Sequence, residues 1–404
     1  MTTQEMAEKI AQIAGTFTPS APVDDVSLFA GRLPQVGQVA NAVAQKGQHV
    51  VMYGERGVGK TSLANVLKYI LASFNRNTCV IKLNCENKST ATSIWRGAMR
   101  EIPFFRERIS PGFSDSKATE KVSLNLLIPD DVSADDVRYV LQQVPGELVI
   151  IFDEIDRIKN KKTLSSLSNT IKTLSDNAVP TTLILVGVAD SVHGLIAEHA
   201  SIGRAIEEVL MPRMSEKELK EIITKGLAKV GMTITESALG RIVHLSHGLP
   251  HYTHLLGLYG AQRAVGADTL EITGQHVLEA IRTAVTKTQE SIRNAYHIAV
   301  GSRQGNIYRQ VLLACALAKV DELGYFQTVD VRDPMSRIMS KRYEINAFIQ
   351  HLHDFCSEER GKILIQKGRR KSYRYRFVDP LMQPFIVMKG LSDGLITEEL
   401  WDLK

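Results

Sequence analysis

A glycine-rich segment near the beginning of the chain has the composition of a phosphate-binding loop. Residues 54–61 read Gly-Glu-Arg-Gly-Val-Gly-Lys-Thr and lie between an apolar run at 49–53 and a helix-forming stretch. The glycines let successive N–H groups face phosphate oxygens, while Lys60 supplies a positive charge and Thr61 a hydroxyl ligand for Mg²⁺. The residues that we predict to contact a nucleoside triphosphate here are Gly54, Glu55, Arg56, Gly57, Val58, Gly59, Lys60, Thr61 and Ser62.

An acidic pair, Asp153 and Glu154, follows a second apolar run at 148–152. At the carboxyl edge of a parallel sheet, Asp153 can hold the magnesium ion through water, and Glu154 can accept a proton from an attacking water. An acidic pair after a strand, taken by itself, is as often a solvated turn or a helix cap. The preceding phosphate loop favours the catalytic interpretation. Because passive storage of a nucleotide would not need Glu154, the pair also favours hydrolysis.

Two further polar residues are weaker candidates for the same site. Asp190 follows an apolar run at 182–188, where its side chain can orient the attacking water, although a helix cap is an equally good interpretation. Arg204 precedes the last apolar run, at 209–211, and can reach the γ-phosphate of a neighbouring subunit as an arginine finger. A surface arginine in a simple ion pair is the alternative for Arg204.

The order of apolar runs and helical stretches predicts the fold. Apolar runs at 49–53, 79–84, 148–152, 182–188 and 209–211 alternate with helix-length amphipathic stretches. This alternation indicates a parallel sheet with helices on both faces, the α/β fold of a P-loop NTPase. An all-α lid follows, opened by a capping box at Ser215, and then three helices and a β-hairpin in the order of a winged helix.

We predict the following divisions of the chain. They are an N-terminal segment at 1–48 that leads into the core, the ATPase core at 49–214 with an insertion at 103–130, the lid at 215–295 and a winged-helix domain at 302–404. The insertion has the pattern of a hairpin. The last lid helix is predicted at 273–295, and the third winged-helix helix is predicted to be continuous over 343–356.

Positive charge is concentrated on the predicted C-terminal hairpin. Eight cations and no carboxylate lie between residues 360 and 376, which exceeds the net charge of +5 of the whole chain. Such a patch can neutralise the phosphates of duplex DNA, with low sequence specificity and an affinity that falls steeply with salt. The alternative is a solvated hairpin or one that docks on protein. The predicted DNA-contacting residues are Lys367, Arg369, Arg370, Lys371, Arg374 and Arg376.

These motifs together resemble those of the AAA+ ATPases. The resemblance rests on the order of Phe29-Ala30-Gly31-Arg32, the phosphate loop, the acidic pair, Arg204, the lid and the winged helix. It points to the initiator clade of origin-recognition ATPases and to related bacterial ATPases of mobile elements and defence systems. The resemblance implies ATP and Mg²⁺ as cofactors and self-association of the chain. In that family an arginine follows a Gly-x-Pro element of the lid, and here His251 takes that place after Pro250.

The predicted function is that of an ATP-hydrolysing switch that binds DNA through its winged helix and assembles into an ATP-dependent oligomer. Replication initiation, transposition and defence, with or without a partner protein, are the processes in which we expect it to act. The alternative is a STAND-like signalling ATPase whose winged helix contacts protein. Four cysteines without a CxxC pair, and apolar runs far shorter than the roughly 20 residues of a membrane helix, favour a cytoplasmic protein with no membrane partner.

Overall fold

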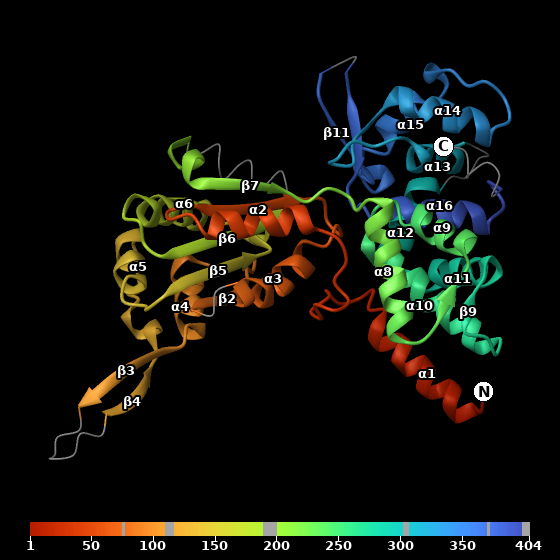
Figure 1. The fold of residues 1–404 in the computed structure, drawn as a ribbon. Helices are drawn as coiled ribbons and strands as arrows, with labels where there is room; N and C mark the ends of the chain where they lie inside the picture. Colours follow the sequence, from red (N-terminus) through yellow and green to blue (C-terminus); the bar gives the residue numbers. More distant parts are fainter. Residues whose placement is uncertain (75–76, 110–116, 189–199, 302–306, 370–371, 398–404) are drawn as a thin grey trace.

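The computed structural model describes residues 1–74, 77–109, 117–188, 200–301, 307–369 and 372–397. These residues form two bodies that short connections join (Figure 1). One body is a sheet covered by helices, and the other contains the lid and the C-terminal residues. Within the described residues, every helix is too short or too polar to cross a membrane.

The first body is built on a five-stranded parallel sheet in the order β2-β5-β6-β1-β7. The strands are β1 (His49–Gly54), β2 (Thr78–Asn84), β5 (Glu147–Asp153), β6 (Thr181–Val188) and β7 (Ile206–Leu210). The predicted sheet is confirmed, although the last strand begins at Ile206 and is longer than the run at 209–211. Only β6 separates β1 from β5, so the phosphate loop and the acidic pair leave the sheet at the same edge.

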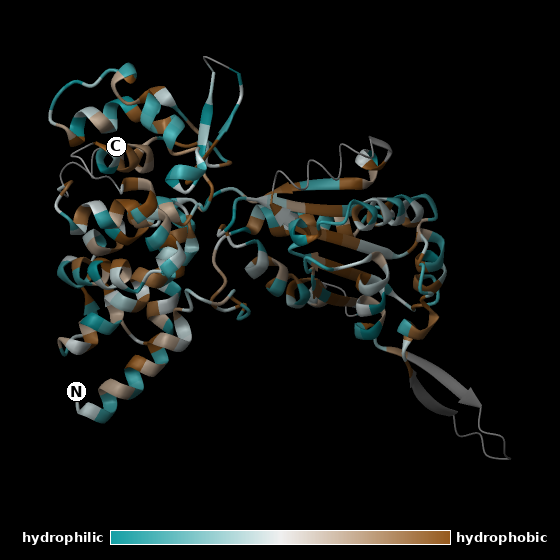
Figure 2. Ribbon diagram, turned by 180° about the vertical axis from the view of Figure 1, so that it is seen from behind, coloured by the Kyte–Doolittle hydropathy of each residue, from teal (hydrophilic) through white to brown (hydrophobic). Residues whose placement is uncertain are grey.

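Helices cover both faces of this sheet, as the alternation of apolar and amphipathic stretches predicts. Alternate residues of the central strands enter two separate hydrophobic clusters, one beneath α2 and α3 and the other beneath α4, α5 and α6. Figure 2 shows the strands as predominantly hydrophobic and the helices as mixed. The helices are α2 (Leu33–Val43), α3 (Lys60–Phe74), α4 (Ala91–Glu101), α5 (Ala134–Leu141) and α6 (Lys161–Asp176).

The first residue of β1, His49, is buried beneath this sheet. Its side chain is 1% exposed, and its Nδ1 accepts a hydrogen bond from the Leu183 N–H at 3.0 Å. Burial lowers the pKa of His49 to about 4. The imidazole is therefore neutral in the folded protein at neutral pH.

We expect the free energy of unfolding to fall between pH 6.5 and pH 4, with His49 contributing on the order of 3 kcal/mol of the loss. The unfolded chain binds a proton at His49 below pH 6.5, whereas the folded protein resists protonation until about pH 4. Urea unfolding at pH 7.5 and pH 5 measures this change. His49→Gln should show a shallower pH dependence, and the exposed His297→Gln is the control; equal slopes for wild type and His49→Gln would contradict the assignment.

The insertion between β2 and β5 contains an antiparallel hairpin, as predicted. Strands β3 (Phe104–Ile109) and β4 (Lys117–Val122) pair from Phe104 opposite Val122 to Ile109 opposite Lys117. A short 3₁₀ turn, η1 (Leu124–Leu127), returns the chain to the core beside α4. Figure 1 shows the hairpin projecting from the sheet body, on the side away from the lid.

The lid contains five helices, and it differs from the prediction in three places, one of which is that two short strands, β8 and β9, pair in parallel within the predicted all-α lid. Ser215 caps α8 through a capping box with Glu218, as predicted. The predicted helix at 273–295 is interrupted at Thr288 and Gln289, so that α11 and α12 are separate, and α12 extends to Val300. The lid elements are α8 (Glu216–Lys229), β8 (Thr233–Ile234), α9 (Glu236–Leu245), α10 (Pro250–Gly266), β9 (Glu271–Ile272), α11 (Gly274–Lys287) and α12 (Glu290–Val300).

The N-terminal segment at 1–48 is divided between the two bodies. Helix α1 (Thr3–Thr16), which has no counterpart in the prediction, packs against α10 of the lid, whereas α2 packs against the sheet. Phe17, at the end of α1, is 1% exposed, and its ring lies so close to Gly226 and Gly257 that a Cβ on either glycine would meet it. The residues after Phe17 then run along the gap between the bodies.

The C-terminal module, which we define as residues 307–397, contains four helices and a three-stranded antiparallel sheet in the order β10-β12-β11. The predicted continuous helix at 343–356 is wrong, because Phe348 interrupts it between η4 and the six-residue α15. Helix α16, absent from the prediction, packs against α13 and α11. The elements are α13 (Tyr308–Leu317), β10 (Phe326–Gln327), α14 (Thr328–Ile338), η4 (Ile345–Ala347), α15 (Ile349–Asp354), η5 (Glu358–Arg360), β11 (Leu364–Lys367), β12 (Arg374–Phe377) and α16 (Met382–Ser392).

Candidate functional site

A cavity of about 600 Å³ lies where the phosphate loop, the end of β5 and the lid meet. Its wall also includes residues 18–23 and 28–30 of the connection after α1, and Leu381 of the C-terminal module. The predicted site residues on the cavity wall are Arg56, Gly57, Gly59, Lys60, Thr61, Ser62, Asp153, Glu154 and His251.

The phosphate loop has the backbone conformation that its glycines predict. Gly57 and Gly59 have φ values of 85° and 95°, which lie in the left-handed region that favours glycine. Lys60 begins α3, so the helix N-terminus and its unpaired N–H groups face the cavity. The Lys60 ammonium donates to the carbonyl oxygens of Gly54 at 3.1 Å and Glu55 at 2.7 Å. Burial lowers the pKa of Lys60 to about 8.

Asp153 is buried at the end of β5, with its carboxylate held from two sides. Its Oδ1 accepts a hydrogen bond from the Glu154 N–H at 2.8 Å, and its Oδ2 lies 3.0 Å from the Lys82 ammonium. Lys82 also donates to Asn65 Oδ1 at 2.7 Å. Nothing in the residue pattern singles out Lys82 except that it is the only charged residue of β2. Lys82 neutralises and orients the carboxylate that we predict to face the magnesium ion.

Glu154 lies at the cavity wall in a strained backbone conformation. Its φ of 58° is uncommon for a residue with a side chain and costs on the order of 1 kcal/mol. The carboxylate is partly exposed and forms an ion pair with Arg157 Nε at 3.1 Å. Glu154 and Arg157 both lie on the cavity wall, so this ion pair is part of the site.

Oxygen ligands for Mg²⁺ are present where the motifs predict them. The Thr61 hydroxyl and the Asp153 carboxylate both lie on the cavity wall, and hard cations prefer such ligands. Asp153 Oδ2 is buried and, among the described residues, has no hydrogen-bond donor besides its ion pair with Lys82. The residues therefore fit a magnesium ion.

The lid and the connection after α1 close the cavity from the other side. His251 Nδ1 lies 2.8 Å from the Pro19 carbonyl oxygen, and burial lowers the pKa of this histidine. Arg32, in the predicted motif at 29–32, is 2% exposed and donates from Nη2 to the Val58 carbonyl at 2.7 Å. The motif at 29–32 thus supports the phosphate loop directly, and His251 joins the lid to the connection.

Three predicted nucleotide contacts lie away from the cavity. The Glu55 side chain is turned toward Arg213, whose Nε lies 2.6 Å from Glu55 Oε2. Val58 is fully buried in the hydrophobic core. Gly54 packs against Met211, whose carbonyl oxygen would lie 2.2 Å from a Cβ at position 54. Their side chains, or the space for one, are directed into the protein, so only their backbone groups can contact phosphates, as the predicted role of the loop requires.

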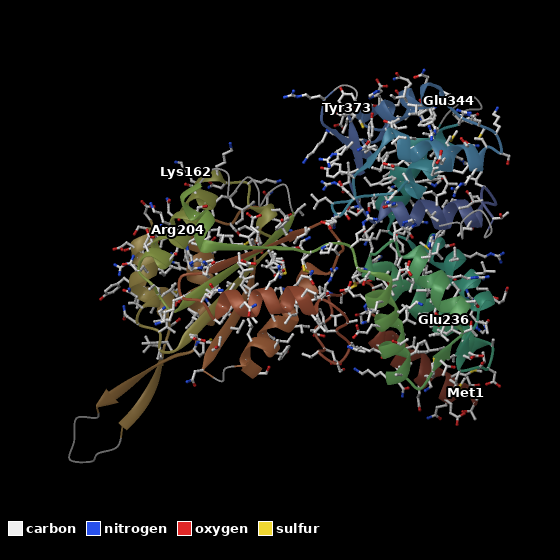
Figure 3. The ribbon with its side chains drawn as sticks, turned by 45° about the horizontal axis from the view of Figure 1, so that its top comes forward. Met1, Lys162, Arg204, Glu236, Glu344 and Tyr373 are labelled. Atoms are coloured by element: carbon white, nitrogen blue, oxygen red, sulfur yellow. The ribbon has the colours of Figure 1, made fainter. Side chains whose placement is uncertain are left out.

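One of the two weaker catalytic candidates, Arg204, lies away from the cavity wall. Arg204, in η3 (Ala200–Ala205), has an 82% exposed side chain and pairs with Asp176 at 3.3 Å. Figure 3 shows Arg204 on the surface of the sheet body. Asp190 lies outside the described residues. In this single chain Arg204 therefore matches the surface ion pair that we gave as its alternative interpretation.

The predicted DNA-contacting residues divide into exposed and internal groups. Arg376 is 9% exposed and lies over the Tyr325 ring, with its guanidinium carbon 4.7 Å from the ring centroid, so it does not fit a direct phosphate contact. Lys367 and Arg374 also lie over this ring, and Arg374 forms an ion pair with Asp321 at 3.2 Å. Arg369 is exposed near the turn. Arg370 and Lys371 lie outside the described residues.

Comparison with known proteins establishes the family of this chain. Residues 21–360 match the family described as novel STAND NTPase 1, which covers the core, the lid and most of the C-terminal module. The chain belongs to this novel STAND NTPase family. The predicted resemblance to AAA+ ATPases and the predicted P-loop fold are confirmed.

The proteins to which this STAND NTPase is similar include initiator-type ATPases. An ORC1-type DNA replication protein of Methanoregula boonei is 23% identical over 258 residues, which is 60% of this chain and 56% of the relative, so the chain spans about half the length of that protein. A Walker-type ATPase of Pyrococcus abyssi is 16% identical with a TM-score of 0.51, covering 92% of this chain and 99% of that one. The Orc1 protein of Aeropyrum pernix, solved in complex with DNA, is 15% identical with a TM-score of 0.48, covering 94% and 97% of the two chains.

Proposed function

We propose that this STAND NTPase binds ATP with Mg²⁺ in the cavity and hydrolyses it, and that the protein acts as a nucleotide-dependent switch. The observation that carries this proposal is the convergence of Lys60, Asp153 and Glu154 on one cavity that the lid also lines. Lys60 and the N-terminus of α3 would orient the phosphates. Thr61 and Asp153 would hold Mg²⁺, which stabilises the charge that develops on the phosphates. Glu154 would accept a proton from the attacking water.

Titration calorimetry with ATP and with GTP, combined with a phosphate-release assay, tests this proposal. We expect saturable heat with ATP in the presence of Mg²⁺, together with steady release of phosphate. A pure, folded protein that gives no heat with either triphosphate would overturn the proposal. Binding without phosphate release would retain the switch but remove the proposed role of Glu154.

We further propose that the ATP-bound chain associates with itself and that Arg204 then reaches the phosphates of a neighbouring subunit. The support for this step is the exposure of Arg204, whose ion pair with Asp176 is at the surface and therefore weak. We expect Glu154→Gln protein with ATP to elute as an oligomer from a gel-filtration column with light-scattering detection. Arg204→Ala should lower ATP turnover at least tenfold, whereas Lys172→Ala on α6 should not. A monomer under all nucleotide conditions would refute the role of Arg204.

DNA binding by the C-terminal module is the second function that we propose. The order of α13, α14, α15 and the β11–β12 hairpin supports a winged helix with an exposed Arg369 near the hairpin turn. The curated relative is named as a DNA replication protein. The burial of Arg376 and the ion pair between Arg374 and Asp321 instead favour the alternative, in which the module contacts protein. A role in replication initiation, transposition or defence follows only if DNA is bound.

Replacing Arg369, Arg370 and Lys371 together by alanine should weaken binding to a duplex of arbitrary sequence at least tenfold and should lower its salt dependence, because three phosphate contacts are removed. Fluorescence anisotropy at salt concentrations between 50 and 200 mM measures the effect. Binding that depends on phosphate contacts weakens over this range. The charge-matched control replaces Lys159, Lys161 and Lys162, which are exposed on the sheet body. Equal binding by both triple variants, or binding independent of salt, would favour a protein partner.

A further inference from the structure

Three parts of the molecule meet at one buried arginine outside the cavity. Arg213 lies between β7 and α8, and it donates from Nε to Glu55 Oε2 at 2.6 Å and from Nη2 to Oε1 at 3.3 Å. Its Nη1 donates to the His247 carbonyl of the lid at 3.2 Å and to Gln383 Oε1 of α16 at 2.7 Å. The Glu55 and Arg213 side chains are 1% and 12% exposed. A single guanidinium thus connects the phosphate loop, the lid and the C-terminal module.

The C-terminal module completes the surroundings of the Glu55 carboxylate. Gly324, with a φ of 76°, lies so close that a Cβ there would be 1.8 Å from Glu55 Oε1. Gln383 is 1% exposed, and its Nε2 donates to the Ala316 carbonyl at 2.8 Å, which directs its Oε1 toward Arg213. A buried ion pair is stable only when its remaining polar atoms have partners. The module supplies one of these partners and also excludes water.

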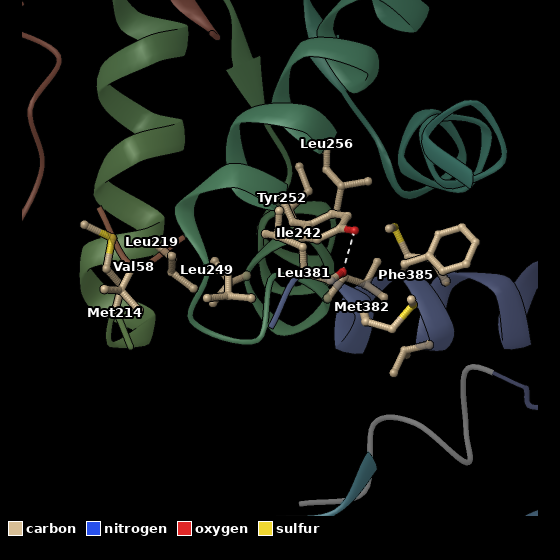
Figure 4. Packing of buried hydrophobic residues seen from close by; sticks show 14 of the residues in the cluster. Val58, Met214, Leu219, Ile242, Leu249, Tyr252, Leu256, Leu381, Met382 and Phe385 are labelled. Carbon is tan, nitrogen blue, oxygen red and sulfur yellow. Dashed lines mark hydrogen bonds between the residues drawn. The ribbon is translucent and has the colours of Figure 1, made fainter. Parts of the chain in front are cut away.

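Apolar contacts hold the same module against the phosphate loop. If residue 57 carried a Cβ atom, that atom would lie 3.3 Å from Leu381 Cδ2, so the Leu381 side chain packs closely on Gly57. The Leu381 side chain also forms part of the cavity wall. The Tyr252 hydroxyl of the lid donates to the Leu381 carbonyl at 2.7 Å. Figure 4 shows this bond and the packing of Val58 and Met214 in the same cluster. The position of the module is therefore defined by the loop and the lid together.

Glu55 also connects this junction to the nucleotide site. Its carbonyl oxygen accepts a hydrogen bond from the Lys60 ammonium, which a bound phosphate would attract, while its carboxylate is held by Arg213. We infer that Arg213 is a positioning residue that couples nucleotide binding at the phosphate loop to docking of the C-terminal module. This inference rests on the proposed binding of ATP. Because coupling is reciprocal, ATP stabilises the docked module and the docked module tightens ATP binding.

Gln383→Leu tests the coupling, since it removes the bond between the module and Arg213 and leaves Glu55 and the cavity residues in place. We expect its Kd for ATP, measured by calorimetry, to be at least threefold higher than that of the wild type. Lys389→Gln, also on α16 but paired with Asp393, is the matched control and should change the Kd less than threefold. A change of less than threefold for Gln383→Leu, with wild-type protein that binds ATP, would overturn the inference. Wild-type protein that does not bind ATP would instead refute the proposed function.

A second readout separates coupling from simple support of the fold. Hydrogen exchange of residues 382–392 should slow when ATP is added to the wild type, and this response should be lost in Gln383→Leu. A residue that only supports the fold would accelerate exchange equally with and without ATP, and that result would overturn the inference. If Gln383→Leu does not fold, Arg213→Lys serves in its place, because it retains the charge but a single ammonium cannot make these four contacts.

Discussion

Glu154→Gln should bind ATP with an affinity within threefold of the wild type and hydrolyse it at least 100-fold more slowly. The amide retains the shape of the side chain but cannot accept the proton of the attacking water, and loss of a general base typically costs a factor of 10² to 10⁴. Lys60, Thr61 and Asp153 are unchanged, so the contacts to the phosphates and the magnesium ion remain. Calorimetry and phosphate release, measured on the same preparation, separate binding from turnover.

Glu208→Gln is the matched control for this variant. Glu208 is an exposed carboxylate of β7, so its replacement makes the same change of charge away from the cavity. We expect wild-type turnover from it. The Glu154 ion pair with Arg157 is partly exposed, so its loss should change the melting temperature little. Turnover within threefold of the wild type in Glu154→Gln would show that another group activates the water.

Lys60→Ala should weaken ATP binding on the order of 100-fold. Each charge-assisted hydrogen bond from the ammonium to a phosphate oxygen contributes about 1.5–3 kcal/mol, and the substitution removes these bonds. Without Lys60 the carbonyl groups of Gly54 and Glu55 also lose their donor, which leaves the loop less well defined. Turnover at saturating ATP should fall as well, because the lysine also stabilises charge on the outer phosphates.

Lys68→Ala provides the comparison, since Lys68 is exposed on the same helix and contacts only the neighbouring Tyr69 among the interactions of the described residues. Its Kd for ATP should equal that of the wild type. Circular dichroism of both variants establishes that they are folded. If Lys60→Ala bound ATP as tightly as Lys68→Ala, the phosphates would not occupy the loop at 54–61.

The parts of the fold that depend on contiguous residues could be predicted from the sequence. The phosphate loop, the capping box at Ser215 and the presence of a hairpin in the insertion at 103–130 each depend on a local pattern that packing elsewhere did not change. Whether a helix is continuous depends less on the local sequence pattern. The spacing of Phe348, Leu352 and Phe355 gives their burial correctly, yet the backbone at Phe348, with a φ of −132°, leaves the helical region.

The candidate site was predictable only where a motif fixes both the backbone and the side chain. Lys60 and Asp153 lie where the motifs place them. Glu55 belongs to the same loop, but its side chain direction depends on Arg213, a residue distant in sequence with no motif of its own. Lys82 was not predictable for the same reason, because its partner Asp153 becomes its neighbour only when β2 and β5 pair. Sequence periodicity contains no information about such long-range partners.

The position of β1 between β6 and β7 has a consequence for synthesis of the protein. Both neighbours of β1 begin at Thr181 or later, so a nascent chain exposes two unpaired edges of an apolar strand until β6 has been made, and one until β7 has been made. Unpaired edges of this kind promote aggregation. The cavity wall also includes Leu381, so a partial product without the C-terminal module has an incomplete wall. Fragments that end before the C-terminal module should therefore depend on chaperones and gain less solubility from added ATP than the full chain.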